Sequence, residues 1–306
     1  MPSVALLASI GNTPLVRLTR LRDPGSADVF VKLEGANPTG SMKDRMALSM
    51  IEGAERRGAL TPGGTVVDYT GGSTGSSLAM VCAVKGYRSH FLSSDAFAAE
   101  KLQTMRAFGA TVELIPSVNR KVTPAIIELA LVRVRELAAN PGTYWTKQFD
   151  NPDNRAAYHA MAREILRDLA AAPTAFVMGV GTGGCFSGNA EVLHERGTRC
   201  VALEPEACPA LSRSGPLGGH RLEGIGAGFV PSICRLDLAD SIVAVTDADA
   251  YDMTRRLARE EGIFGGITSG ANVWAALRLA REIGPGGSVV TVIVDSGLKY
   301  LQGDLY

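Results

Sequence analysis

The sequence lacks the features that mark several classes of protein. Lys plus Arg and Asp plus Glu each number 31 among 306 residues, and neither sign of charge forms a long block. The basic patch of a nucleic-acid-binding or membrane-surface protein is therefore missing. No apolar run approaches the ~20 residues that span a bilayer, and the first residues lack the basic region of a secretion signal. We expect neither nucleic acid nor a membrane as a partner.

Cysteine is scarce and shows no pattern. The five cysteines are odd in number, no CxxC occurs, and the four histidines do not cluster with cysteines or acids. This predicts neither a disulfide framework nor a metal site, and free thiols are typical of the reducing cytoplasm. The expected partners are small molecules or a second copy of the chain. The cysteines are Cys82, Cys185, Cys200, Cys208 and Cys234.

Short β-branched runs alternate with amphipathic stretches along the whole chain. The pattern predicts an α/β protein with two doubly wound domains, each a parallel sheet with helices on both faces. Ligands are expected at the carboxyl ends of the strands. Predicted strands cover residues 65–70, 88–94, 110–116, 174–180, 199–205, 241–246 and 288–294. Predicted helices cover residues 74–85, 96–109, 123–140, 154–172, 184–196, 247–262 and 270–284.

Two glycine-rich turns each join a predicted strand to a predicted helix. One is "VVDYTGGSTGSS" from Val66 and the other is "VMGVGTGGCFSG" from Val177. Backbone N–H groups and a helix N-terminus favour an anion at such turns. The second turn also fits GxGxxG, and Glu204 follows about twenty residues later, as in dinucleotide-binding folds. From the residues alone, a nucleotide-binding oxidoreductase stays open.

Lys43 stands at the start of a predicted helix, in "NPTGSMKDR", where Pro38 and Gly40 predict a turn. A positive charge in the first helical turn opposes the helix dipole. The position is suitable for a lysine that is neutral and bound as an imine to an aldehyde cofactor. The alternative is a solvated lysine compensated by Asp44 and Glu34.

Eight segments in order resemble the cysteine synthase and cystathionine β-synthase family of fold-type II pyridoxal-phosphate (PLP) enzymes. They are "IGNTPLVRL", "NPTGSMKDR", "TGGSTG", "KQFDNPDN", "GVGTGG", "EGIGAGFVP", "GITSGA" and "SGLKYL". The resemblance implies a tryptophan synthase β-like fold, a homodimer, and two domains beside a PLP cleft. Residues 36–146 would form the smaller, mobile domain that binds the substrate carboxylate. Residues 1–35 and 147–306 would form the larger domain that binds the PLP phosphate.

The resemblance also implies residue roles. Lys43 would form the imine with PLP and then act as the base, and Ser296 would hydrogen-bond the pyridine nitrogen. The neutral hydroxyl of Ser296 is suited to β-elimination. Ser73 takes the place of a residue that contacts the cofactor ring. The PLP phosphate would be bound by Gly181, Thr182, Gly183, Gly184 and Cys185. The substrate would be bound by Thr70, Gly71, Gly72, Ser73, Thr74, Gln148 and Gly226.

The implied reaction is β-replacement on an O-activated L-serine, as in the conversion of O-acetyl-L-serine and sulfide to L-cysteine and acetate. Alternatives are another donor or nucleophile (O-phosphoserine, homocysteine, an amine), a cysteine or serine lyase, and an inactive relative that binds a partner. These stay open because several positions depart from the family pattern. Ser73 replaces an asparagine, Gly71 a serine and Cys185 a threonine. The other departures are Arg155, Leu298 and Lys299.

Overall fold

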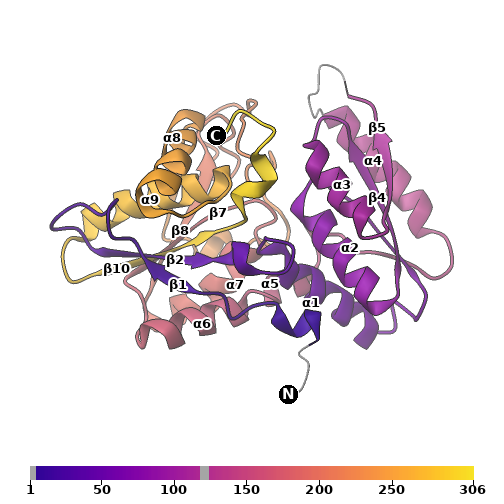
Figure 1. Ribbon diagram of the computed structural model, residues 1–306, viewed down its shortest axis with the longest axis horizontal. Coiled ribbons are helices and arrows are strands. Elements are labelled where there is room, and N and C mark those ends of the chain that lie inside the picture. Colours follow the sequence, from indigo (N-terminus) through magenta and orange to yellow (C-terminus); the bar gives the residue numbers. More distant parts are fainter. Residues whose placement is uncertain (1–4, 118–123) are drawn as a thin grey trace. The chain divides into compact units, whose positions relative to one another are not determined.

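Strands and helices alternate along the chain and build two separate sheets in the computed structural model, which describes residues 5–117 and 124–306 (Figure 1). The chain divides into two units. Unit 1 comprises Met1–Ile10 and Lys43–Asn154, and unit 2 comprises Gly11–Met42 and Arg155–Tyr306. Both units have the α/β composition expected from the alternating sequence pattern.

Unit 1 contains a four-stranded parallel sheet in the order β5-β4-β3-β6. Helices α2 and α3 contact the sheet or each other, and α4 packs on β3 and β4. A hydrophobic cluster of Val67, Leu92 and α4 side chains forms the core between sheet and helix. The elements are η1 (Leu6–Ser9), α1 (Lys43–Arg56), β3 (Thr65–Tyr69), α2 (Ser73–Lys85), β4 (Arg88–Ser94), α3 (Ala99–Ala107), β5 (Thr111–Ile115), α4 (Pro124–Ala138) and β6 (Thr143–Trp145).

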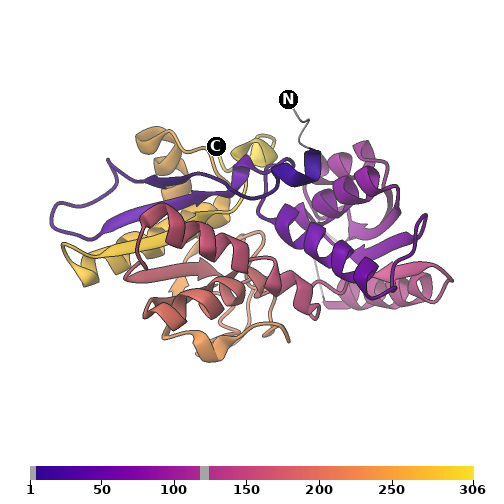
Figure 2. The same ribbon diagram turned by 90° about the horizontal axis from the view of Figure 1, so that it is seen from below.

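Unit 2 contains a six-stranded sheet in the order β1-β2-β10-β7-β8-β9. Helices α8 and α9 cover one face and α6 and α7 the other (Figures 1 and 2). The strands are β1 (Leu15–Arg17), β2 (Asp28–Leu33), β7 (Ala175–Gly179), β8 (Arg199–Pro205), β9 (Ser241–Val245) and β10 (Ser288–Ile293). The α-helices are α6 (His159–Leu169), α7 (Gly184–Leu193), α8 (Asp247–Arg256) and α9 (Ile267–Ile283). The short turns of helix are η2 (Glu34–Ala36), η3 (His194–Arg196), η4 (Leu236–Leu238), the π-helix η5 (Leu257–Glu261) and η6 (Gly297–Tyr300).

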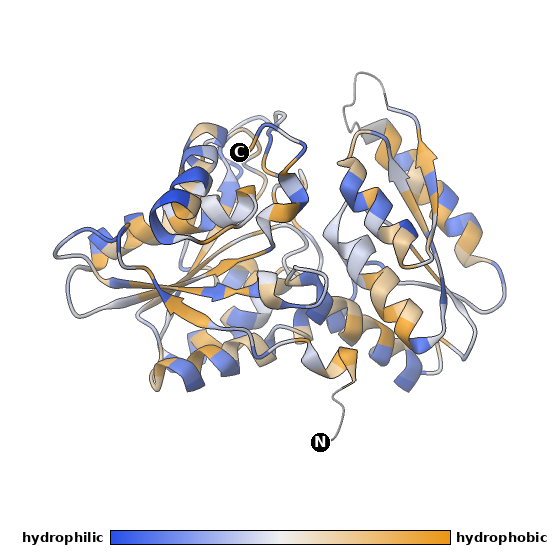
Figure 3. Cartoon of the chain, viewed as in Figure 1, coloured by the Kyte–Doolittle hydropathy of each residue, from blue (hydrophilic) through white to orange (hydrophobic). Residues whose placement is uncertain are grey.

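Hydrophobicity explains which side of each helix is buried. In Figure 3, α6 and α8 alternate between hydrophilic and hydrophobic positions, as expected of helices that pack one side on a sheet. The strands β7 and β8 are buried almost throughout, because helices cover both faces of the sheet. No helix in the described part of the chain is long and apolar enough to cross a bilayer.

Several features differ from the sequence prediction, and the strands β2 and β6 are among those that were not predicted. The β1 strand was not predicted, and it pairs antiparallel with β2 at the edge of an otherwise parallel sheet. The helix predicted over residues 154–172 is two helices, α5 (Pro152–Ala156) and α6. The break buries Tyr158 completely, and its Cβ approaches the backbone of α7 where Gly188 leaves room.

The strand register determines which loops lie together. In unit 2, β10 pairs in parallel with both β2 and β7, so the segments after these strands leave the same edge of the sheet. In unit 1, β3 pairs in parallel with β6 through Val67 and Trp145. The segments after Tyr69 and Trp145 therefore lie side by side. These two edges carry the residues that the sequence singled out.

Candidate active site

In unit 1, the first glycine loop runs from the end of β3 into α2. Thr70 Oγ1 accepts hydrogen bonds from the N–H groups of Gly72 (3.3 Å) and Gly75 (3.2 Å). Gly72, the N-cap residue of α2, has no side chain of its own to cap the helix, and Thr70 Oγ1 takes the N–H of Gly75 in the first turn. First-turn N–H groups have no carbonyl partner within a helix. The loop therefore presents donors to an anion, and the half-buried Ser73 begins the helix.

Gln148 lies against this loop. Its Nε2 donates to the carbonyl oxygen of Tyr69 (2.9 Å), and its Oε1 accepts from Thr74 Oγ1 (3.0 Å). Gln148 is almost completely buried. One side chain thus ties the end of β3 to the first turn of α2, and it fixes the hydroxyl of Thr74 in the loop.

Asp68 anchors Gln148 and was not identified from the sequence. Its carboxylate accepts from Trp145 Nε1 (3.2 Å), from the hydroxyl of Thr146 and from the backbone N–H of Gln148 (3.4 Å). Burial raises the pKa of Asp68 to about 6, although these hydrogen bonds act in the opposite direction. Asp68 could have been identified as an acidic residue at the end of a buried strand, directly before the loop.

Phe97, which precedes α3, and Lys101 of α3 lie over the same loop, and sequence reasoning missed both. A Cβ added to Gly71 would lie 2.1–2.4 Å from three ring carbons of Phe97. Lys101 runs past Gly72, and its Cδ lies 3.3 Å from the position that a Cβ would take there. The missing side chain at position 71 is therefore explained by the aromatic ring above it.

In unit 2, the second glycine loop joins β7 to α7. A Cβ on Gly181 would lie 2.0 Å from the carbonyl oxygen of Gly224, so two glycine segments are packed backbone to backbone. Thr182 is buried, and its Oγ1 accepts from Gly184 N–H at 3.4 Å. Gly183, the N-cap residue of α7, has no side chain of its own to cap the helix. This helix start is also suited to an anion.

The remaining residues of this loop are fixed from behind. Cys185 is buried, and Asn189 Nδ2 donates to its carbonyl oxygen at 2.8 Å. Gly226 donates its N–H to the carbonyl oxygen of Val180 at 3.1 Å. Thr268 Oγ1 donates to the carbonyl oxygen of Glu223 at 2.7 Å. The structure thus places Gly226 beside the cofactor loop predicted at residues 181–185.

Ser296 lies at the end of β10, on the same sheet edge. Its Oγ accepts from the N–H of Leu298 at 3.3 Å, and its own N–H donates to the carbonyl oxygen of Gly40 at 2.9 Å. A serine hydroxyl has one donor and two acceptor sites. Because the N–H of Leu298 uses only an acceptor site of the Ser296 hydroxyl, the hydroxyl proton can still be donated to a ring nitrogen. Capping of η6 and binding of a cofactor by Ser296 are therefore compatible.

Lys43 is the first residue of α1, as predicted, and it is half-buried. The residue before it, Met42, donates its N–H to the carbonyl oxygen of Val294 at 2.9 Å. Ser41 forms a bridge with Asp295. Backbone bonds to the end of β10 therefore fix the segment that leads into Lys43.

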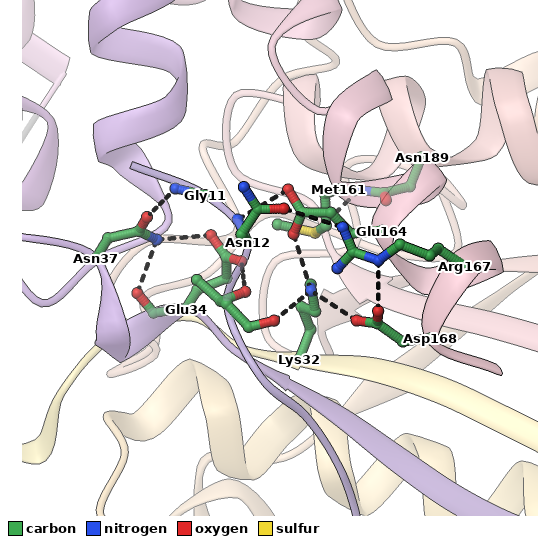
Figure 4. A network of polar contacts seen from close by, with 11 residues as sticks. Gly11, Asn12, Lys32, Glu34, Asn37, Met161, Glu164, Arg167, Asp168 and Asn189 are labelled. Atoms are coloured by element: carbon green, nitrogen blue, oxygen red, sulfur yellow. Dashed lines mark hydrogen bonds and ion pairs between the residues drawn. The ribbon is translucent and has the colours of Figure 1, made fainter. Parts of the chain in front are cut away.

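A buried polar network holds the residues that precede this segment in the chain (Figure 4). Glu34 accepts from Thr13 Oγ1 (2.6 Å) and Asn37 Nδ2 (2.8 Å), and Asn37 Oδ1 accepts from Gly11 N–H (2.9 Å). The fully buried Lys32 binds Glu164 at 2.8 Å. A buried charge needs such a partner, so the network fixes the "IGNTPL" segment and the turn at residues 37–40.

Glu204 does not have the role that a dinucleotide fold would give it. Its buried carboxylate accepts from the N–H groups of Leu211 (2.7 Å) and Ser212 (3.2 Å) and from the Ser212 hydroxyl. It closes a loop of unit 2. Among the described residues, no group of His, Cys, Asp and Glu could hold a metal ion.

The residues of these edges are suited to PLP. A phosphate matches the glycine-rich start of α7, a pyridine nitrogen matches the hydroxyl donor of Ser296, and an aldehyde matches the primary amine of Lys43. No carboxylate occupies the position of Ser296, so the ring nitrogen would meet a neutral donor. The donor set therefore defines a PLP enzyme of fold type II.

Comparison with known proteins establishes the family. Residues 6–295 match the family described as pyridoxal-phosphate dependent enzyme, and the chain belongs to it. Cysteine synthase of Staphylococcus aureus is 42% identical over 301 residues, which cover 97% of this chain and 95% of that one. The protein is thus a PLP-dependent enzyme of the cysteine synthase type, and the oxidoreductase reading is wrong.

Solved structures show the same relationship. O-ureido-L-serine synthase superposes with a TM-score of 0.91 at 37% identity, covering 98% of this chain and 94% of that chain. A hydrogen sulfide-producing enzyme of Fusobacterium nucleatum superposes with a TM-score of 0.91 at 38% identity, covering 98% and 99%. The fold-type II assignment made from the sequence is confirmed.

Proposed function

We propose that the protein converts O-acetyl-L-serine and sulfide to L-cysteine and acetate. The observation that carries the proposal is the segment that ends at Lys43, which is bonded to the strand end bearing Ser296. In this proposal, Lys43 supplies the amine and Ser296 the ring-nitrogen donor for the cofactor. The similarity to a cysteine synthase supports the choice of donor and nucleophile.

In this proposal, some residues bind the cofactor and others bind the substrate. Residues 181–185 hold the PLP phosphate, and Ser73 lies at the cofactor ring. Thr70, Gly71, Gly72, Ser73 and Thr74 bind the substrate carboxylate, with Gln148 holding Thr74 in place. Gly226 lines the substrate side of the cofactor loop. The domain that carries residues 36–146 moves onto the substrate, and the rest of the chain holds the cofactor.

PLP, when bound, supplies an electron sink for the bond changes at the substrate Cα and Cβ. Lys43 takes the proton from the substrate Cα once its amine has been released. The carboxylate loop holds the substrate so that this proton faces the amine.

Absorbance of the purified enzyme and product analysis test the proposal. We expect visible absorbance from bound PLP, cysteine formation from O-acetyl-L-serine and sulfide, and loss of both in Lys43→Ala. Lys85→Ala is the matched control, because Lys85 pairs with Glu55 at the far end of α2 (2.9 Å). A colourless protein that stays colourless with added PLP would refute the assignment.

A second reaction deserves a parallel assay because one similar structure is that of a hydrogen sulfide-producing enzyme. In a lyase, cysteine would be consumed and sulfide released without a second nucleophile. Sulfide release from L-cysteine that is faster than cysteine synthesis would favour the lyase. O-phosphoserine as donor, and homocysteine or an amine as nucleophile, complete the panel.

We also propose a cytoplasmic homodimer. All five cysteines are free, which is typical of a reducing compartment. The resemblance to the family supports the dimer, and Leu298 and Leu301 expose apolar surface near the chain end. Size-exclusion chromatography with light scattering tests the oligomeric state.

A further inference from the structure

The segment "GIGAG" at residues 224–228 packs on the loop of unit 2 that is proposed to bind the cofactor phosphate. The carbonyl oxygen of Gly224 would lie 2.0 Å from a Cβ on Gly181. The N–H of Gly226 donates to the carbonyl oxygen of Val180 at 3.1 Å. Gly224 and Gly226 have φ values of +101° and +70°. Glycine adopts such a backbone freely, but it also loses the most conformational freedom on folding. The segment therefore needs contacts that hold it.

His220 supplies one of these contacts. Its Nε2 lies 3.0 Å from the carbonyl oxygen of Gly226, and a Cβ on Gly226 would lie 2.6 Å from the same nitrogen. The Cys208 thiol lies 3.8 Å from that oxygen, so the imidazole is the closer donor. The His220 ring thus packs directly on the glycine and also bonds to its peptide group.

The partners of the two ring nitrogens determine the tautomer of His220. A backbone N–H is only a donor, and a carbonyl oxygen is only an acceptor. Nδ1 accepts from the N–H of Leu222 at 3.2 Å, so this nitrogen carries no proton. Nε2 faces the carbonyl oxygen of Gly226, so it carries the single proton of a neutral imidazole. A proton on Nδ1 would remove the bond to Leu222.

We propose that His220, as the neutral Nε2–H tautomer, is a positioning residue that holds residues 224–226 against the cofactor loop and thereby strengthens PLP binding. The inference rests on the proposed function, which places the PLP phosphate at residues 181–185. Two hydrogen bonds, through Gly226 and Val180, connect the His220 ring to the strand end that leads into this loop. A site that is ordered for only part of the time binds its ligand more weakly in proportion to the ordered fraction. Loss of the Nε2 bond should therefore weaken PLP binding although His220 is not a residue of the phosphate loop.

Two substitutions of His220 separate the two bonds of its ring. In His220→Gln, the amide nitrogen reaches the place of Nε2 and can donate to the carbonyl oxygen of Gly226. In His220→Asn, the amide oxygen takes the place of Nδ1 and can accept from the N–H of Leu222. Each variant thus keeps one hydrogen bond and loses the other. A role in the general stability of unit 2 would be affected equally by the two changes, whereas the proposed role depends on the Gly226 bond.

The dissociation constant of PLP, measured by absorbance after dialysis of each holoenzyme against a series of PLP concentrations, tests the proposal. One lost hydrogen bond corresponds to about 2- to 12-fold in an equilibrium constant. We expect His220→Asn to raise the dissociation constant by about this factor and His220→Gln to change it by less than about twofold. Equal weakening in both variants, wild-type binding in both, or the larger effect in His220→Gln would overturn the proposal.

His194→Gln and His194→Asn are the matched controls, because His194 is exposed on η3 and lies 3.7 Å from Asp240. Both should bind PLP as the wild type does. NMR of the histidine ring nitrogens in the wild-type holoenzyme tests the tautomer even if a variant does not fold. The His220 signal is identified by replacing the other three of the four histidines one at a time.

We expect this ring to carry its proton on Nε2. A proton on Nδ1 under the assay conditions would overturn the proposal without any variant of His220. The outcome is separate from that of the reaction assignment, because cysteine formation is not the readout. If PLP binding depends on the Nε2 bond but no cysteine is formed, the reaction assignment fails and the role of His220 stands.

Discussion

Gly71 and Phe97 form a steric pair, and restoring a side chain at position 71 should disrupt it. The change is Gly71→Ser, which introduces the residue that is common in the family. Its Cβ would lie 2.1 Å from Phe97 Cε1 and 2.2 Å from Cζ. Carbon atoms in contact are normally about 3.5–4.0 Å apart. The ring or the loop must therefore move.

The size of the effect depends on which group moves. Forcing an extra group into a packed site costs about 1–3 kcal/mol. Phe97 is half-buried and also lies 6.5 Å, centroid to centroid, from the ring of Tyr69. If the Phe97 ring swings away, the enzyme loses that contact, which places the cost nearer about 1 kcal/mol. In Phe97→Ala the space is open, so adding Gly71→Ser should cost less than about 0.5 kcal/mol.

Thermal unfolding of the four holoenzymes in this double-mutant cycle measures the coupling. For a chain of this length, 1 kcal/mol corresponds to about 1.5–2 °C in Tm, so Gly71→Ser alone should lower Tm by about 1.5–6 °C. Gly219→Ser is the control for the chemical change, because nothing lies within 4 Å of a Cβ at that position. An equal loss of Tm from Gly71→Ser in the presence and absence of the Phe97 ring would refute the steric explanation.

Three further predictions concern residues outside this pair. Asp68 has a pKa of about 6, above its ordinary value of 3.8, so its protonated form favours the folded state. This contribution to the free energy of unfolding is complete below about pH 4 and is lost as the pH rises through about 6. Over that range, the free energy of unfolding of the wild type should fall by up to about 3 kcal/mol relative to that of Asp68→Asn, as measured by unfolding at a series of pH values. Gly181→Ala, which meets the Gly224 carbonyl oxygen at 2.0 Å, should lower Tm and release PLP, measured by absorbance, whereas Gly219→Ala should do neither. Glu204→Gln should lower the free energy of unfolding by about 1–3 kcal/mol, because it weakens the hydrogen bonds to Leu211 and Ser212. NADH should stabilise neither the wild type nor this variant in the same unfolding assay.

The sequence was sufficient to predict those strands and helices that carry a local signal of their own, and β1, β2 and β6 were not among them. The β-branched run of β3 and the glycine after α3 are read from neighbouring residues. The edge strand β1 has only three residues, Leu15–Arg17, which is too short for a periodic pattern. The break before α6 depends on the close approach of Tyr158 to Gly188. Contacts between residues distant in sequence leave no such local signal.

The same limit applies to the site. The sequence assigned Gln148, Thr74 and Gly226 to substrate binding only through resemblance. The structure adds the hydrogen bond between Gln148 and Thr74 and the bond from Gly226 to Val180. Phe97, Lys101 and Asp68 were missed because each acts on a loop that is distant along the chain. The four-residue spacing from Phe97 through Lys101 to Met105 was visible. Its meaning required knowing what lies beneath that face of α3.

The glycine loops also show why a motif alone does not identify a cofactor. Gly181 is required by the backbone of Gly224 and Gly71 by the ring of Phe97, so packing explains both glycines before any anion is considered. A GxGxxG match reports a tight turn between strand and helix, which many phosphate ligands can use. What distinguishes PLP from a dinucleotide lies on the neighbouring strand ends. There, Ser296 offers a hydroxyl proton and the segment bonded to it ends in the amine of Lys43.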